Sequence, residues 1–218
     1  MDSAFQRGLK HHDQPVEECL EKMELSSRDN LANLATLGLT LDFSGIKYFF
    51  ELGGSALSGD KLMAWLEFCL EMNLFLKAIG NDNITFLWQV RDDVNTYFRK
   101  HSKIEDLNRY HRNADTFILE QLAFFAKSIN FPLPEGQARR EAIIGPNNFL
   151  YQLSHLPQHQ NLHQSILNIA VNWFDHLFWL EEYKEAADIL NHICFALARR
   201  GQKKMAENML AAIAGKTK

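Results

Sequence analysis

Hydrophobic residues recur at three- and four-residue spacing along most of the chain, which is the pattern of helices that bury one face. The strongest stretch is 60–79, DKLMAWLEFCLEMNLFLKAI, where most positions outside a narrow stripe of Asp60, Glu67 and Glu71 are apolar. A helix that is apolar nearly all round is covered by neighbours on several sides. We therefore expect 60–79 to be the central helix of the fold, ended by Gly80.

The same spacing predicts helices on both sides of this stretch. Upstream, we expect a short helix over 16–23 and a second one that Ser26 or Ser27 caps and Gly38 ends, while 43–52 is ambiguous between helix and strand. Downstream, a helix is expected from about 84 to 101 because its apolar residues step by three and four. These residues are Ile84, Leu87, Val90, Val94, Tyr97 and Phe98.

A capping box of Ser102 and Glu105 predicts the start of the longest helix, which Pro132 and Pro134 end. Its predicted buried face runs over about seven turns, at 3.6 residues per turn. The face consists of Ile104, Leu107, His111, Ala114, Ile118, Leu122, Phe125 and Ile129, widened by Phe117 and Phe124.

Residues 130–160 carry the weakest helical pattern, since they hold four of the five prolines. Two short helices, 136–144 and 147–156, are expected there, and we place a soft domain boundary in this region. The expected organisation is a flexible arm, a helical bundle, a proline-containing connection and a helical-hairpin region, with one continuous domain over 14–214 as the alternative. The four ranges are 1–13, 14–131, 132–160 and 161–218.

The C-terminal third has the clearest pattern, with helices expected over 162–179, 182–199 and 202–213. Short connections between successive helices imply that neighbours run antiparallel. The alternation typical of strands does not stand out at any point. The predicted class is therefore all-α, a multi-helix bundle with a C-terminal, solenoid-like stack of antiparallel helical hairpins.

The two turns of this region, in 177–186 (LFWLEEYKEA) and 197–206 (LARRGQKKMA), resemble the inter-helix turn of tetratricopeptide-type hairpins. In that family a small residue follows the turn glycine by five positions, and Ala206 holds this spacing from Gly201. The turns lie 20 residues apart, against a full repeat of about 34. The resemblance thus implies a three-helix, solenoid-like fragment over roughly 164–214.

A second resemblance covers roughly 43–102. The residues Phe49-Phe50, Leu57–Leu62, Trp65 and Tyr97-Phe98 are similar to the middle of a regulator-of-G-protein-signalling box. In that family a Glu-Asn pair at the start of the fourth helix holds the switch loops of a Gα subunit. Here Lys61 takes the Asn position, and Ala64 replaces the Phe that precedes the Trp. The resemblance implies a regulator of a GTPase as an alternative function.

Composition narrows the class of protein. The hydrophobic share of 46% is ample for a globular core, and the net charge of −4 gives no electrostatic footprint for nucleic acid. Cys19, Cys69 and Cys194 are far apart, and the last two fall on apolar faces of predicted helices, so we expect free thiols and a cytoplasmic location. With no apolar run near 18 residues and no signal-peptide pattern, the chain is expected to be soluble.

The sequence carries no convincing motif for catalysis, cofactor binding or metal binding. His155, His159 and His163 have helical ligand spacing, but Pro157 interrupts it, and a polar loop is the preferred interpretation. The segment 54–61 resembles a phosphate loop only superficially, because Asp60 separates the second glycine from the lysine. We predict no cofactor, no metal and no enzymatic activity.

The candidate binding surface lies on the predicted helix 162–179. Its polar face is rich in amides and nearly free of charge, which favours a recognition surface over an ordinary solvated one. This face consists of Asn161, Gln164, Ser165, Asn168, Asn172, Asp175 and His176. Trp179 lies in line with it, and Trp is enriched at binding hot spots. Our hypothesis is that Asn168, Asn172, His176 and Trp179 bind a protein or peptide; the alternative is that Trp179 caps the core.

A second candidate is the basic cluster of Arg199, Arg200, Lys203 and Lys204, which spans a turn between two helices. Lys203 and Lys204 lie at a helix N-terminus, where positive charge is unfavourable. The cluster is therefore interpreted either as a docking site for an acidic partner or as an ordinary solvated turn.

The predicted function is a non-catalytic protein–protein interaction module, such as an adaptor, a chaperone-like protein or an assembly subunit, with protein partners and homo-oligomerisation both open. The alternatives are the GTPase regulator and an enzyme whose site is assembled from scattered residues.

Overall fold

The computed structural model describes residues 15–54, 57, 59–80, 82, 84–136, 138–145, 149–153, 160–199 and 201–216. The chain groups into two compact units, Met1–Ala114 and Asp115–Lys218. The division lies inside helix α6 (Ile104–Ser128), whereas the sequence analysis places its boundary in 132–160.

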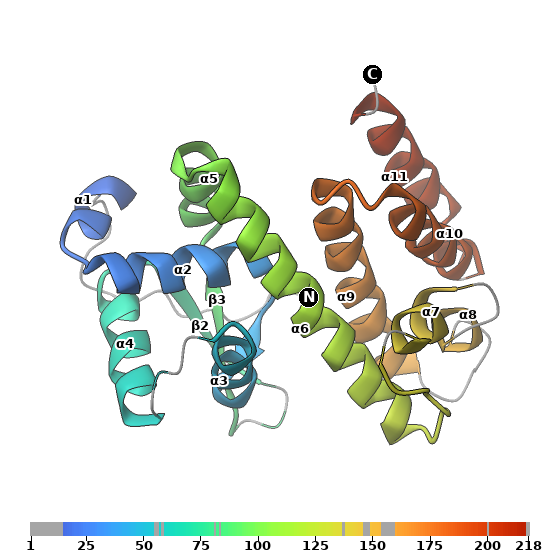
Figure 1. The fold of residues 1–218 in the computed structure, drawn as a ribbon, viewed down its shortest axis with the longest axis horizontal. Helices are drawn as coiled ribbons and strands as arrows, with labels where there is room; N and C mark the ends of the chain where they lie inside the picture. The colour runs from blue at the N-terminus through green and yellow to red at the C-terminus, as the bar shows by residue number, and fades with distance from the viewer. Residues whose placement is uncertain are drawn as a thin grey trace. The chain divides into compact units, whose positions relative to one another are not determined.

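The first unit combines helices with a small sheet (Figure 1). The expected helix 16–23 is confirmed as α1 and the helix ending at Gly38 as α2, and the ambiguous stretch 43–52 is helix α3. The expected cap at Ser26 or Ser27 is wrong, because α2 begins at Leu25 and both serines lie in its first turn. The elements are α1 (Val16–Glu21), α2 (Leu25–Leu37), β1 (Leu41–Asp42), α3 (Phe43–Leu52), α4 (Gly59–Glu71), β2 (Phe75–Ile79), β3 (Phe86–Val90), α5 (Asp92–His101) and the start of α6.

Local chemistry sets two of these boundaries. Gly38 ends α2 with a left-handed φ of 67°, which glycine adopts without steric cost. Asp42 caps α3, because its carboxylate accepts a hydrogen bond from the Gly45 N–H at 2.7 Å. This cap explains why an aromatic stretch that also suits a strand is helical here.

The prediction of one helix over 60–79 is wrong in its second half. Helix α4 ends at Glu71, and Asn73 adopts a left-handed φ of 55°. The N–H of Leu74 bonds the Cys69 carbonyl at 2.9 Å, and that of Asn73 bonds the Leu70 carbonyl at 3.0 Å. This pair of bonds is a Schellman motif, in which Asn73 takes the place usual for glycine. The chain then continues as strand β2.

The expected helix 84–101 is also wrong in its first part, since 86–90 is strand β3 and the helix begins at Asp92. Ile84, Leu87 and Val90 have helical spacing, but alternate residues of β3 are the buried ones, Trp88 and Val90. The sheet has the order β1-β3-β2 and is antiparallel, with Lys77 opposite Trp88 and Ile79 opposite Phe86. The protein is therefore mostly helical, and all-α is correct only as a coarse description.

The order of elements in this unit is informative. Helices α3 and α4 follow each other, and the hairpin β2–β3 comes directly after α4, with β3 central in the sheet. This is the topology of a winged helix–turn–helix. Its core contains a row of edge-to-face aromatic contacts, from Phe50 to Trp65 at 5.6 Å and from Trp65 to Phe75 at 5.8 Å between ring centroids. These contacts fix α3, α4 and β2 against one another.

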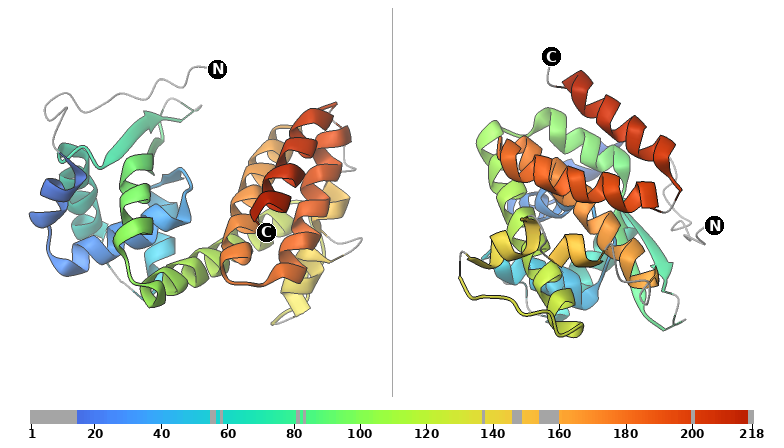
Figure 2. Two further views of the ribbon diagram at one scale, coloured as in Figure 1. Left: turned by 90° about the horizontal axis from the view of Figure 1, so that it is seen from above. Right: turned by 90° about the vertical axis from the view of Figure 1, so that its right-hand side faces the viewer.

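The second unit is built from helices. The expected C-terminal helices are confirmed as α9 (Gln160–Trp179), α10 (Tyr183–Arg199) and α11 (Lys203–Lys216), and two short helices, α7 (Ala138–Ile144) and α8 (Phe149–Leu153), precede them. Figure 2 shows α9, α10 and α11 side by side. Glu181 and Gly201 adopt left-handed φ values of 62° and 73° in the two connecting turns.

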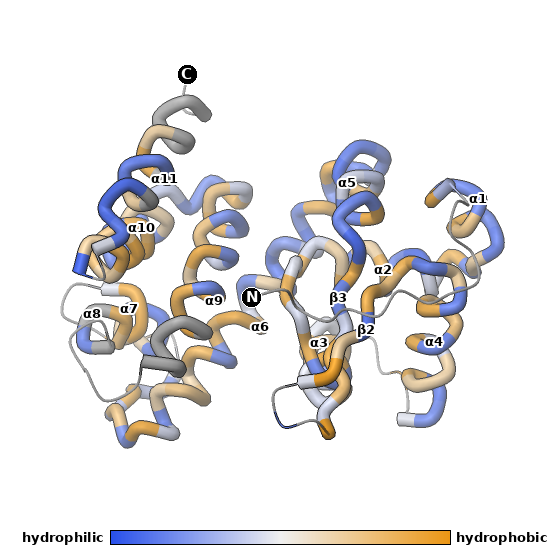
Figure 3. Tube along the Cα trace, turned by 180° about the vertical axis from the view of Figure 1, so that it is seen from behind, coloured by the Kyte–Doolittle hydropathy of each residue, from blue (hydrophilic) through white to orange (hydrophobic). Residues whose placement is uncertain are grey.

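The helices of both units alternate hydrophobic and hydrophilic segments along their length (Figure 3). In α6 most of the predicted buried face is confirmed, including Leu107, Ala114 and Leu122. Four members of the predicted face are not buried. Ile104, in the first turn, and Phe124 are exposed, while Phe125 and Ile129 are half-buried, and Ile129 lies beyond the end of α6.

Candidate functional site

The exposed face of α9 differs in part from the expected one. Asn168, Asp175 and Trp179 are exposed and Asn172 is half-buried, at the i, i+4, i+7 and i+11 positions of one face. His176 is turned inward, with 2% of its surface exposed, and its Nε2 lies 2.9 Å from Asn172 Oδ1. Of the four predicted residues, His176 therefore supports Asn172 from inside and does not belong to the exposed face.

The C-terminal end of α9 carries an aromatic surface. Trp179 is 38% exposed, and Tyr183, the first residue of α10, is 54% exposed. The Phe178 ring lies 5.4 Å from that of Tyr183 and 5.8 Å from that of Phe174 between centroids. We call Trp179 and Tyr183 the aromatic pair. The sequence analysis missed Tyr183, although its place directly after the acidic turn was a usable signal.

The turn between these two residues is held by Arg140 of α7. Its Nε donates to Glu185 Oε2 at 2.6 Å and its Nη2 to Glu182 Oε2 at 2.8 Å. Its Nη1 donates to both carboxylate oxygens of Asp115, at 2.9 and 2.8 Å. Trp173 of α9 donates its indole N–H to the same Asp115, at 2.6 Å. We call these five residues the Arg140 network.

The network is electrostatically dense, with three carboxylates around one guanidinium. Burial opposes the charge of Arg140, but its hydrogen bonds to the Asp115 and Glu185 carboxylates outweigh burial and raise the pKa of Arg140. Burial, together with the charges of Asp115 and Glu185, raises the pKa of Glu182 despite the opposing charge of Arg140. Since every polar group named here has a partner, the network fixes α7, α9 and the start of α10 in one arrangement.

Among the residues that the structure describes, no group of three or more His, Cys, Asp or Glu is placed to hold a metal ion. The three carboxylates of the network accept hydrogen bonds from Arg140, and Asp115 also accepts one from Trp173. What the site offers is a pair of aromatic side chains on a rigid base, which is the composition of a binding hot spot.

The basic cluster lies at the other end of α10. Tyr183 and Arg199 are 16 residues apart along one helix, which corresponds to about 24 Å. Arg199 lies over the Phe195 ring, 5.7 Å from its centroid, and Lys203 pairs with Glu207 at 3.9 Å. Lys204 is exposed, and Arg200 lies outside the described residues. The two predicted clusters therefore form separate surfaces of the second unit.

In the first unit, the second helix of the helix–turn–helix exposes more acidic than basic residues. The second helix of such a pair reads the DNA groove, and phosphate contacts need Lys or Arg. On α4 the exposed charged residues are Asp60, Lys61, Glu67 and Glu71, three acids against one base. This face therefore carries a net negative charge.

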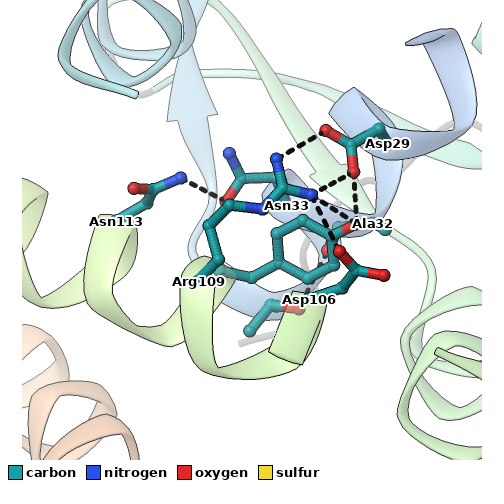
Figure 4. A network of polar contacts seen from close by, with 8 residues as sticks. Asp29, Ala32, Asn33, Asp106, Arg109 and Asn113 are labelled. Carbon is teal, nitrogen blue, oxygen red and sulfur yellow. Dashed lines mark hydrogen bonds and ion pairs between the residues drawn. The ribbon is translucent and has the colours of Figure 1, made fainter. Parts of the chain in front are cut away.

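A second polar network ties α2 to α6 in the first unit (Figure 4). Asp29 accepts hydrogen bonds from Arg109 Nη2 at 2.6 Å and from Tyr110 Oη at 2.5 Å, and Arg109 also pairs with Asp106 at 3.3 Å. Burial and the hydrogen bond to Asp29 raise the pKa of Tyr110. The role of this network is to fix the two helices, because Tyr110 is buried and its hydroxyl already has its acceptor.

The remaining sequence candidates add no site. His155, His159 and Pro157 lie outside the described residues, as does the side chain of His163. Asp60 and Lys61 lie in the first turn of α4 and not in a loop. Within the described part of the chain, no helix has the length and apolarity needed to cross a bilayer.

Comparison of the chain with protein-family models, with curated proteins and with solved structures finds no match.

Proposed function

We propose that this protein is a non-catalytic protein–protein interaction module, of the adaptor, chaperone-like or assembly-subunit kind, that binds a partner through the aromatic pair at the α9–α10 turn. The observation that carries the proposal is the combination of two exposed aromatic side chains, one on each side of the α9–α10 turn, with the hydrogen bonds from Arg140 to Glu182 and Glu185 at that turn. Rigid aromatic anchors lose little conformational entropy on binding, because their support is formed in advance. The surface extends along α9 to Asn172 and Asn168.

The proposal includes a helical scaffold for this surface. In it, α9, α10 and α11 act as a solenoid-like stack of antiparallel hairpins, the arrangement implied by the resemblance to tetratricopeptide-type turns. The buried free thiols Cys19 and Cys69 and the half-buried free Cys194 support a reducing, cytoplasmic location. Burial raises the pKa of the Cys69 thiol, which makes it unreactive.

Site-specific photo-crosslinking in the native host tests the function. A benzophenone amino acid is placed at Tyr183 and, as a matched control, at Phe195, an exposed aromatic position on the same helix. We expect a discrete crosslinked protein from position 183 and not from 195. The Trp179→Ala variant carrying the crosslinker at 183 should lose that product while its melting temperature stays within a few degrees of the parent, since the residue is partly exposed.

Two results would contradict the proposal. Equal crosslinking from 183 and 195 would indicate non-specific contact. A large fall in melting temperature for Trp179→Ala would assign that residue to the core, as in the alternative interpretation of the sequence. The GTPase-regulator alternative stays a prediction, and a crosslinked G protein that is captured in one nucleotide state only would establish it.

A further inference from the structure

The structure points to a second interaction surface, in the first unit, that is independent of the aromatic pair. Strand β2 is an edge of the sheet, with β3 on its one paired side. The flanking hydrogen bonds, from Gly80 N–H to the Thr85 carbonyl at 2.7 Å and from Arg91 N–H to the Leu74 carbonyl at 3.1 Å, show which residues face β3. Bonded and non-bonded pairs alternate along an antiparallel ladder.

It follows that Leu76 and Ala78 bond to β3, while the backbone groups of Phe75, Lys77 and Ile79 point away from it. Among the described residues, these outward N–H and C=O groups have no hydrogen-bond partner. A row of unpaired backbone donors and acceptors is a template for another strand.

Two devices that protect natural edges, a Pro in the strand and an outward-reaching Lys, are not found in β2 (Phe75–Ile79). Natural edges are guarded by Pro or by an outward-reaching Lys, and β2 has the sequence FLKAI. Its lysine does not reach outward, because Lys77 Nζ lies 4.0 Å from the centroid of the Phe86 ring and 5.6 Å from that of Trp88. Lys77 therefore lies across the hairpin, on the face that it shares with both rings.

The side chains beside the edge define what an added strand must carry. Lys77 and Ile79 share a face, and Ile79 is 58% exposed next to Phe86, which is 46% exposed. An acidic residue opposite Lys77 would form a stabilising cross-strand pair with it, and a β-branched or aromatic residue would do the same opposite Ile79. These two positions are separated by one residue in the added strand.

We propose that β2 is a docking edge for an extended segment of a partner protein, which adds a fourth strand with an acidic residue opposite Lys77 and a β-branched or aromatic residue two positions away, opposite Ile79. A second copy of this chain is the less favourable occupant. The antiparallel register that pairs all five residues of two β2 strands places Lys77 opposite Lys77, and like charges directly opposite are destabilising.

A random dodecapeptide phage library panned against the full chain tests the proposal. We expect the selected peptides to share an acidic residue and a β-branched or aromatic residue at i and i+2. On binding of a synthetic selected peptide, the amide protons of Lys77 and Ile79 should become protected from hydrogen exchange.

Two pairs of variants separate the edge from its side chains. Ile79→Pro removes an outward N–H and should weaken peptide binding more than about tenfold, whereas Ile79→Thr keeps that N–H and should weaken it only about two- to threefold. Lys77→Glu should weaken binding about fivefold, and a peptide with Lys in place of its acidic residue should recover it. Amide protection at Leu76, Ala78, Leu87 and Gln89 verifies that the hairpin is intact.

Several outcomes would overturn the proposal. These are failure of the library to yield binders, equal loss of binding in Ile79→Pro and Ile79→Thr, and protection on peptide binding that lies away from β2. A concentration-dependent dimer that Ile79→Pro abolishes would assign the edge to a second copy of the chain instead. Since β2 and the aromatic pair lie in different units, variants at Trp179 leave each of these results unchanged.

Discussion

Arg140 binds both carboxylate oxygens of Asp115 through a single nitrogen, at 2.9 and 2.8 Å. Their side chains are only 23% and 14% exposed, so this is a largely buried ion pair. Removing one partner of such a pair leaves an uncompensated charge in a poorly solvated place, which costs more than the pair contributes. In this protein the effect is multiplied, because Glu182 and Glu185 depend on the same guanidinium.

Replacement of Arg140 by Met is therefore expected to lower the free energy of unfolding by about 2–4 kcal/mol. The neighbouring Arg139 is a matched control, because it makes one ion pair, with Glu120 at 2.7 Å. Arg139→Met should cost about 1 kcal/mol or less. Urea unfolding followed by circular dichroism measures both, and equal losses would show that the three-carboxylate arrangement has no special role.

Two of the buried tryptophans, Trp173 and Trp65, give a second test, since they differ in their hydrogen bonding. The indole N–H of Trp173 donates to Asp115, whereas that of Trp65 has no partner among the described residues. Both lose similar volume on replacement by Phe, but only Trp173→Phe loses a hydrogen bond to a charged group, worth about 1.5–3 kcal/mol.

Trp173→Phe should thus be more destabilising than Trp65→Phe by about 1.5–3 kcal/mol in thermal or urea unfolding. The comparison needs no absolute value, because the substitution is the same in both variants. A Trp65→Phe variant that is the less stable of the two would contradict the assignment of hydrogen bonds.

The sequence was a good guide wherever periodicity and a local signal agree. Gly38 follows a clean three-four pattern and ends α2 as expected, and the helices 162–179 and 182–199 are found almost to the residue. Short turns with left-handed residues separate these helices, and their buried faces match their spacing.

The errors come from residues whose conformation is decided by tertiary contacts. The segment 72–79 is as apolar as the helix before it, and only the left-handed Asn73 and the pairing of Phe75 with Val90 make it a strand. The pairing partner lies 15 residues ahead, so no local pattern reveals it. The site shows the same limit. His176 has the helical spacing of a surface residue, but its side chain is buried and lies within hydrogen-bond distance of Asn172.

The pH dependence of stability offers a test of Glu182. Its pKa is raised in the folded state, mainly by burial, so the folded protein binds this proton more readily than the unfolded chain. The contribution of Glu182 to the free energy of unfolding is therefore greatest at low pH. It decreases as the pH rises from the ordinary carboxyl pKa through the raised pKa of the folded protein.

Glu182→Gln removes this component. Relative to the parent, the variant should gain stability as pH rises through that window, and the difference should level off above it. Glu181→Gln, the same change at the adjacent exposed turn residue, is the control for the loss of one charge. Urea unfolding at a series of pH values measures the difference. A Glu182→Gln variant that becomes less stable than the parent with rising pH would show that attraction to Arg140 outweighs burial.

The turn of the hairpin that carries the proposed docking edge is stabilised by a titratable side chain. Asp82 accepts hydrogen bonds from the Ile84 N–H at 3.0 Å, the Thr85 N–H at 2.8 Å and the Thr85 hydroxyl. The Thr85 hydroxyl is the largest contribution, followed by the backbone of Thr85 and Ile84, and together they lower the pKa of Asp82 to about 2. Stability from this carboxylate is present above its unfolded pKa and is lost as pH falls towards 2.

Thr85→Val removes the hydroxyl while keeping the β-branched shape and the backbone donor. We expect the pKa of Asp82 to rise towards about 3.9, the value of an unperturbed Asp, in a carbon-detected NMR titration of its carboxyl group. Thr96→Val is the control, since the Thr96 hydroxyl donates to the Asp92 carbonyl and not to a carboxylate. An Asp82 that titrates alike in the parent and in Thr85→Val would mean that the backbone N–H groups alone hold the turn. The prediction has a structural counterpart: a loosened turn should speed amide exchange at Gly80, whose N–H bonds the Thr85 carbonyl, before it affects Leu76 in the middle of the ladder.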